Sequence, residues 1–298
     1  MTAQKTPFAS APVKVHRSAL YRDNEVPEEV PRDQWDRPLI LVDGVLVPYT
    51  RVSTAAGRLK TTVGLEIWKR RHLALALAKF PDLTMMLAGL TYEADKKEID
   101  RIVNMACERS EAMVVARHHG TAVHTFTDYE VGHEIREFVP EVIRPDIAAY
   151  DRAIKENGLV LQHKELFVVN DTLCVAGTFD GLYLDLATQK LVLGDKKTAA
   201  IIWGPRGGRK GGVSGAYVAG QLGSYHGGRL YDPATGDRFD LPANLDQKSV
   251  MCLHIPRSDG KAEVGRISIE DARHFAALAA MNIDADRRDK HIITPWAA

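Results

Sequence analysis

The chain has 298 residues, of which 45% are hydrophobic and 26% charged, and its 39 basic and 39 acidic residues give a formal net charge of zero. A chain of this size and composition can bury a substantial core, which predicts a soluble enzyme and excludes a protein coated in positive charge. The apolar run 38–47 is short and is broken by Asp43-Gly44, so we expect neither a membrane span nor a signal peptide. We therefore expect the chain to stay in the cytoplasm.

Three regions are predicted along the chain. Residues 1–37 are rich in proline and charge without periodicity, which is typical of a mobile extension. Residues 38–110 are expected to form an N-terminal hairpin and helical region, and residues 111–298 the core. The elements expected before the core strands are a hairpin near 38–50 and helices near 62–80, 94–128 and 143–157.

The core is predicted to be α/β, because apolar β-prone runs are followed by helical patterns and then by further β-prone runs. Two of the runs are separated only by Ala187-Thr188-Gln189, which indicates a hairpin. We expect a mixed central sheet flanked by helices. The elements are strands near 159–169, 173–186 and 190–197, a helix around Gln221, strands near 248–256 and 262–268, and a final helix over 269–289.

Two aspartates lie on this predicted hairpin. If Asp185 faces Lys190 as a cross-strand ion pair, the register places Asp180 directly opposite Asp195. Opposed side chains share a face, with Cβ atoms about 5 Å apart, and two carboxylates that close repel unless one is protonated or a cation lies between them. Oxygen ligands favour Mg²⁺ or Mn²⁺, so a shared divalent cation is the simpler solution.

A lysine follows the second aspartate. Because side chains alternate along a strand, Lys197 falls on the face of Asp195 and Lys196 points away. Lys197 can therefore reach a metal-bound water or a scissile phosphate, as phosphodiester hydrolysis requires. An acid-x-lysine tripeptide is weak by itself, and Asp95-Lys96-Lys97 repeats it in a charged helical stretch. The Asp195 copy differs because it ends an apolar strand and has a second acid in register.

Two helices carry further candidates. His124, in Gly120-Thr-Ala-Val-His124, lies near the end of a helical pattern, where it can supply a third ligand, although surface and satisfied core histidines are common at such positions. Tyr217, Gln221 and Tyr225 recur at i, i+4 and i+8 on one helix face. By itself, this spacing favours an amphipathic helix that packs its tyrosines.

Taken in order, these motifs resemble the RecB-type branch of the PD-(D/E)XK nuclease superfamily, which includes CRISPR-associated adaptation nucleases and many phage exonucleases. That branch is marked by a Gly-x-x-x-His helix, an aspartate on one strand, an acid-x-Lys on the next and a Gln-x-x-x-Tyr helix. The similarity is strong over residues 111–229. It implies a restriction-endonuclease-like core, and a Mg²⁺ or Mn²⁺ ion bound by His124, Asp180, Asp195 and the backbone carbonyl of Lys196.

The resemblance also implies roles for other residues. Lys197 would orient or activate the attacking water and stabilise the charged transition state, while Gln221 and Tyr225 would line the active site near the DNA strand. Glu165 matches an acidic position that contacts a second metal or a water. Some relatives hold an iron–sulfur cluster with four cysteines, and this chain has too few for one. Its three scattered cysteines are Cys107, Cys174 and Cys252.

A glycine-rich segment follows the predicted catalytic strand. Its cations Arg206, Arg209 and Lys210 can follow DNA phosphates, with Tyr217 at the start of the next helix. A solvated glycine linker explains the same residues.

These motifs lead us to expect a Mg²⁺- or Mn²⁺-dependent DNA exonuclease of phage or bacterial recombination or repair, with a single-strand annealing or recombinase protein as a further partner. About 120 residues of largely helical sequence precede His124, and in RecB-like relatives such material fences the catalytic face. The alternatives are a structure-specific or restriction-type endonuclease on the same core and a non-catalytic DNA-binding module. A metal phosphohydrolase is disfavoured, because the chain contains no His-Asp dipeptide. Its ligands would be His118, His119, His124, Asp128 and His133.

Overall fold

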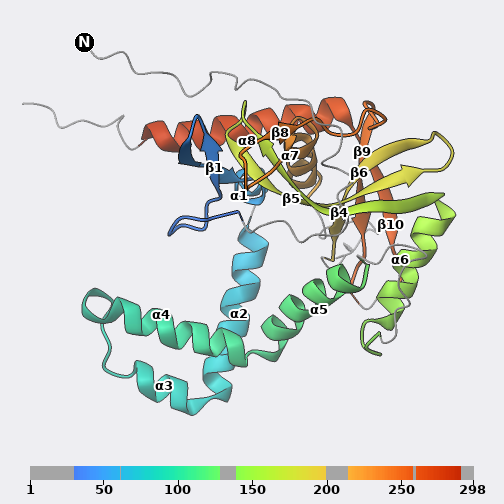
Figure 1. Cartoon of the computed structure of the whole chain (residues 1–298). Coiled ribbons are helices and arrows are strands. Elements are labelled where there is room, and N and C mark those ends of the chain that lie inside the picture. Colours follow the sequence, from blue (N-terminus) through green and yellow to red (C-terminus); the bar gives the residue numbers. More distant parts are fainter. Residues whose placement is uncertain (1–29, 61, 128–138, 199–213, 258–259, 290–298) are drawn as a thin grey trace, which may run out of the picture. The chain divides into compact units, whose positions relative to one another are not determined.

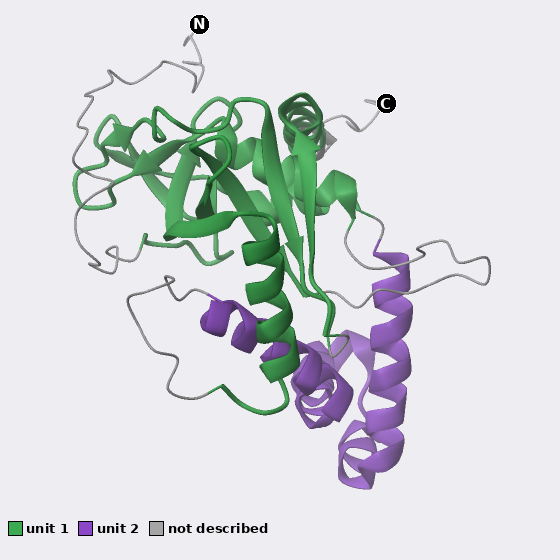
Figure 2. Cartoon of the chain, turned by 90° about the vertical axis from the view of Figure 1, so that its right-hand side faces the viewer, with its two compact units in different colours: residues 1–60, 128–298 green, residues 61–127 purple. Residues whose placement is uncertain are grey.

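The structure, a computed structural model, describes residues 30–60, 62–127, 139–198, 214–257 and 260–289. The chain forms two compact units (Figure 2): unit 1 comprises residues 1–60 and 128–298, and unit 2 comprises residues 61–127. The predicted N-terminal region is therefore divided, because its hairpin belongs to unit 1 and its helices to unit 2. Residues 1–29 of the predicted extension lie outside the described residues.

Unit 2 is helical. Its helices pack around a small apolar core that includes Ala76, Leu83, Ile102 and Ala106. The single helical pattern expected over 94–128 is two helices, because Ser110 adopts an extended backbone with φ −76° and ψ 105°. The helices are α2 (Val63–Lys79), α3 (Pro81–Leu87), α4 (Tyr92–Arg109) and α5 (Glu111–Thr127).

Unit 1 is built on an eight-stranded mixed sheet, with the strand order β10-β9-β6-β5-β4-β7-β8 and with β3 pairing alongside β5 (Figure 1). The β6–β9 and β3–β5 pairs are parallel, and the other pairs are antiparallel. The strands are β3 (Thr50–Arg51), β4 (Leu159–Asn170), β5 (Val175–Asp185), β6 (Lys190–Lys197), β7 (Arg229–Tyr231), β8 (Arg238–Phe239), β9 (Ser249–His254) and β10 (Glu263–Ser268).

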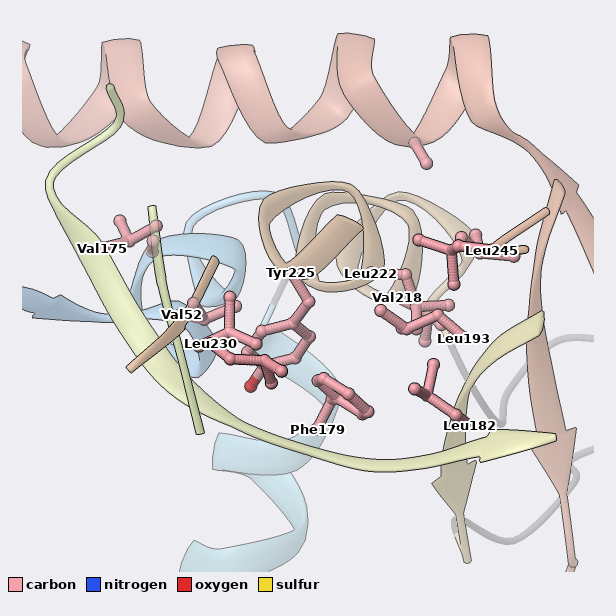
Figure 3. Close-up of a cluster of buried hydrophobic side chains, with 14 of the residues drawn as sticks. Val52, Val175, Phe179, Leu182, Leu193, Val218, Leu222, Tyr225, Leu230 and Leu245 are labelled. Carbon is pink, nitrogen blue, oxygen red and sulfur yellow. The ribbon is translucent and has the colours of Figure 1, made fainter. Parts of the chain in front are cut away.

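Three helices and the sheet enclose the main core of unit 1. They are α1 (Val52–Gly57), α7 (Gly215–His226) and α8 (Ile269–Asp289). In Figure 3, side chains from α7 such as Leu222 meet sheet residues such as Phe179 and Leu193, all of which are fully buried. A further helix, α6 (Arg144–Glu156), packs against β4 and β10.

The predicted α/β class, with a mixed sheet flanked by helices, is therefore confirmed. The longer strands lie within two residues of their predicted limits, because each carries an apolar β-prone run. The two- and three-residue strands β3, β7 and β8 and the short helix α1 were not predicted. Elements that short are decided by pairing with distant partners, which leaves no local pattern.

The predicted N-terminal hairpin is also present, as β1 (Leu39–Val42) paired with β2 (Val45–Pro48). Its turn residues Asp43 and Gly44 have φ values of 50° and 79°, as a two-residue hairpin loop requires. No helix among the described residues has the length and apolarity needed to span a bilayer.

Candidate active site

The register of β5 and β6 is the one predicted. The paired residues run from Asp185 opposite Lys190 to Gly181 opposite Gly194, so the next position in this register sets Asp180 opposite Asp195. The reason for the register differs from the expectation, however. Asp185 binds the turn rather than Lys190, because its Oδ1 accepts hydrogen bonds from the backbone N–H groups of Ala187 (2.9 Å) and Thr188 (3.3 Å).

Asp185 and Lys190 each form an ion pair with a residue outside the hairpin. The Asp185 carboxylate lies 3.1 Å from the guanidinium of Arg266, and the Lys190 ammonium lies 3.9 Å from the carboxylate of Asp246. The turn therefore sets the register, and the alternation of the strands carries it about five residues onward to the two aspartates.

Asp180 and Asp195 are held in different ways. The Oδ2 atom of Asp180 accepts a hydrogen bond of 2.5 Å from the backbone N–H of Lys196, which ties the carboxylate of β5 to β6. Asp195 is only 2% exposed, and its carboxylate forms an ion pair with the ammonium group of Lys197. The structure thus brings these two aspartates and Lys197 together, as predicted.

The lysine remains charged in this setting. Burial lowers the pKa of Lys197, but the carboxylates of Asp195 and Asp180 raise it by more, so the net shift is upward. Together, the two carboxylates and this ammonium leave one negative charge in excess, which favours a cation. Their oxygen donors fit Mg²⁺ or Mn²⁺, which are commonly bound by one or two carboxylates and keep several waters.

The helix α7 contributes the predicted side chains of this site. It begins after Ser214, whose Oγ accepts a hydrogen bond of 3.4 Å from the N–H of Tyr217. The ring centroid of Tyr217 lies 5.5 Å from the Nζ atom of Lys197. Tyr225 points from α7 toward β5, where its ring centroid lies 5.9 Å from that of Phe179 (Figure 3).

Gln221 and Tyr225 lie in the buried layer of the site rather than on its surface. They are 6% and 2% exposed, and the Oε1 atom of Gln221 has no hydrogen-bond partner within the part of the chain that the structure describes. Burial, and next the charge of Asp195, raise the pKa of Tyr225, so its hydroxyl stays protonated. Both side chains are therefore buried within unit 1, and their predicted place near the DNA strand stays a prediction.

Glu165 lies beside Asp180 on the adjacent strand. The pairs Lys164–Gly181 and Leu166–Phe179 flank it, so Glu165 falls in the same row as Asp180. Its backbone has a φ of 50°, and its side chain is exposed. The backbone of Glu165 is thus next to Asp180 on the adjacent strand, and its proposed contact with a second metal or a water stays a prediction.

The remaining predicted residues belong to other parts of the chain. His124 lies half-buried on α5 in unit 2, whereas the two aspartates belong to unit 1, so its role as a metal ligand stays a prediction. Within the described ranges, no group of three or more His, Cys, Asp or Glu side chains is arranged to hold a metal ion. Arg206, Arg209 and Lys210 lie outside the described residues.

Two residues near the site were not predicted. His254 is 4% exposed and is the parallel-strand partner of Lys197, so it occupies the neighbouring position on β9. The only sequence signal for it was its place in a predicted strand. Lys60 follows α1, and its Nζ atom lies 4.0 Å from the ring centroid of Tyr217. Its distance of about 140 residues from the motifs along the chain left no local signal for it.

No protein-family model and no curated protein matches the sequence. A function for this chain is therefore assigned from the residues of the site.

Proposed function

We propose that the chain is a Mg²⁺- or Mn²⁺-dependent deoxyribonuclease that hydrolyses DNA from its ends. The observation that carries this proposal is the convergence of Asp180, Asp195 and Lys197 on two adjacent strands. The helix with Gln221 and Tyr225 packs against the same strands. This order and convergence support a restriction-endonuclease-like core of the RecB-type branch.

The residues of the site would have separate roles in phosphodiester hydrolysis. A divalent cation held by Asp180, Asp195 and the backbone carbonyl of Lys196 would make bound water more acidic and offset the charge of the phosphate. In the net reaction, one water is consumed for each P–O bond that breaks, and the leaving oxygen gains a proton.

Lys197 supplies fixed positive charge in this scheme. Because the pKa of Lys197 is raised, its ammonium group keeps its proton at neutral pH and can stabilise the negative charge that builds on the phosphoryl oxygens. Asp195 orients that group through the ion pair. Asp180 is itself oriented by the N–H of Lys196, so each catalytic side chain is held by a neighbour on the same two strands.

The exonuclease form of the proposal draws on the resemblance and on the helical α2–α5 segment that precedes the core strands. We place the enzyme in phage or bacterial recombination or repair, with DNA as the substrate and a single-strand annealing or recombinase protein as a further partner. His124 stays a prediction as the third metal ligand.

The test compares end-labelled linear duplex with covalently closed circular duplex, each with Mg²⁺ and with EDTA. We expect metal-dependent release of nucleotides or short oligonucleotides from the linear DNA only, and no activity from Asp195→Asn. Nicking of the closed circle by the wild type but not by Asp195→Asn would favour an endonuclease. Absence of cleavage in Mg²⁺ and in Mn²⁺ would favour a non-catalytic DNA-binding module.

Metal binding is tested separately by calorimetric titration with Mn²⁺. Asp180→Ala and Asp195→Ala should each abolish binding, since each removes one of the two carboxylates. The matched control is Asp240→Ala, because Asp240 is exposed and forms a surface ion pair with Arg229 at 3.4 Å. Unchanged binding in both site variants would remove the metal site as described.

A further inference from the structure

Two lysines from distant parts of unit 1 share one tyrosine ring. The Nζ atom of Lys60 lies over the ring of Tyr217, 4.0 Å from its centroid, and the Nζ atom of Lys197 lies 5.5 Å from the same centroid. Both distances are within the range of a cation–π contact. The ring therefore holds a second ammonium group beside the one that the proposed reaction uses.

The fold holds Lys60 in this place. The end of α1 is a tight turn, in which the N–H groups of Leu59 and Lys60 donate to the carbonyls of Ala56 (2.9 Å) and Gly57 (3.4 Å). Leu59 packs on α7 at Gly220, where a methyl group would lie only 2.6 Å from the Cδ1 atom of Leu59. The backbone beside Lys60 is thus fixed to the helix that carries Tyr217.

Carboxylates beside Lys197 balance its positive charge, and Lys60 differs in this respect. In the described ranges, Lys60 forms no ion pair with a carboxylate, whereas Lys197 has both Asp195 and Asp180 nearby. Burial, and then the positive charge of Lys197, lower the pKa of Lys60. An anion placed beside Lys60 would relieve both the desolvation and this repulsion.

We propose that Lys60 binds a phosphate of the DNA strand next to the phosphate that is cleaved beside Lys197. The inference rests on the proposed function for the identity of the ligand, because a DNA strand presents phosphates in a row and two ammonium groups lie beside the ring of Tyr217. Among the described residues, no carboxylate forms an ion pair that would orient Lys60 toward the reacting atoms, so Lys60 acts in binding. Its loss raises KM and the Kd for DNA, and leaves kcat within about threefold.

The experiment measures DNA binding in EDTA, without cleavage, by the fluorescence anisotropy of a short labelled single strand over a series of salt concentrations. Lys60→Met keeps most of the apolar stem and removes the charge. We expect the Kd to rise about tenfold and the slope of log K against log salt to fall by roughly 0.7, the value for one phosphate contact on a single strand. Lys60→Arg should restore both quantities, because it restores the charge.

The matched control is Lys190→Met. Lys190 lies at the other end of the strand that holds Lys197, seven residues and roughly 23 Å away, and its side chain is 44% exposed. This variant should leave the slope unchanged. A salt slope that is unchanged in Lys60→Met, or that falls equally in both variants, would overturn the proposal.

The two proposals can fail separately. DNA binding is measured without a metal, so loss of the salt-slope effect with intact metal-dependent cleavage refutes the role of Lys60 alone. A salt-slope effect in a protein that cleaves no DNA supports the phosphate contact and refutes the nuclease.

Discussion

Replacing Lys197 by methionine tests the site through two quantities, the free energy of unfolding and the rate of DNA cleavage. The variant keeps the apolar stem but removes the ammonium group from the ion pair with Asp195, whose side chain is 3% exposed against 20% for Lys197. Breaking a buried pair on one side costs about 3–5 kcal/mol, because an uncompensated charge stays behind. Since Lys197 keeps some contact with solvent, we expect about 3 kcal/mol less free energy of unfolding in urea titrations with EDTA.

The same substitution should lower the cleavage rate by about two orders of magnitude or more, equivalent to roughly 3 kcal/mol of lost transition-state stabilisation. DNA binding should change by no more than about tenfold. The double variant Asp195→Asn/Lys197→Met should recover most of the stability but none of the activity, since it removes both charges together.

The control is again Lys190→Met on the same strand. Its ion pair with Asp246 has an N–O distance of 3.9 Å and a lysine side chain that is 44% exposed, so its loss should cost less than about 1 kcal/mol. An unchanged urea midpoint for Lys197→Met would show that the pair is not buried in solution. Cleavage within tenfold of the wild-type rate would exclude Lys197 from the transition state.

Three further predictions concern the framework of the site. Gly223→Ala should lower the free energy of unfolding by about 3 kcal/mol in urea titration, because the new methyl group would overlap the backbone carbonyl of Ala272. Lys196→Met should lower the free energy of unfolding and leave kcat nearly unchanged, because its fully buried side chain lies on the face opposite Asp195 and only its backbone contacts the site. A loss of kcat larger than that of Lys197→Met would show that the strand register is wrong by one residue. Burial raises the pKa of Asp185, but hydrogen bonds from the turn and from Arg266 lower it by more, so the net shift is downward from the usual pKa of an aspartate. Asp185→Asn should therefore remove about 1–2 kcal/mol of the free energy of unfolding at neutral pH and flatten its loss as the pH falls through the range where aspartates titrate. An unchanged acid profile would contradict that shift.

The sequence allowed the catalytic strands to be predicted well, because alternation and a short turn are local properties. The pairing of β5 with β6 followed from the apolar runs and the intervening turn. The ion pair used to choose the register was wrong, and the prediction succeeded because Asp185 fixes the same register by binding the turn. Local sequence thus set the correct alignment through a contact that pattern reasoning had not identified.

Long-range contacts set the limit of that reasoning. Lys60 reaches Tyr217 through the packing of Leu59 on α7, and His254 reaches the position beside Lys197 through parallel pairing of β6 with β9. Neither contact has a sequence spacing that a motif could encode. The burial of Gln221 and Tyr225 was missed for the same reason, because a helical period gives a shared face but not the depth of that face.

The position of α7 shows how residues without catalytic chemistry determine the geometry of the site. Gly220 and Gly223 allow Leu59 and the backbone of α8 to approach one side of the helix. On the sheet side, a methyl group at Gly177 would lie 3.1 Å from the hydroxyl oxygen of Tyr225, so β5 also lacks a side chain where that ring lies. These close approaches bring α7 near enough to the strands for Tyr217 to contact Lys197, and near enough to α1 for it to contact Lys60. The spacing of the two ammonium groups therefore depends on small residues, which is why we expect substitutions at these glycines to alter DNA binding and cleavage together.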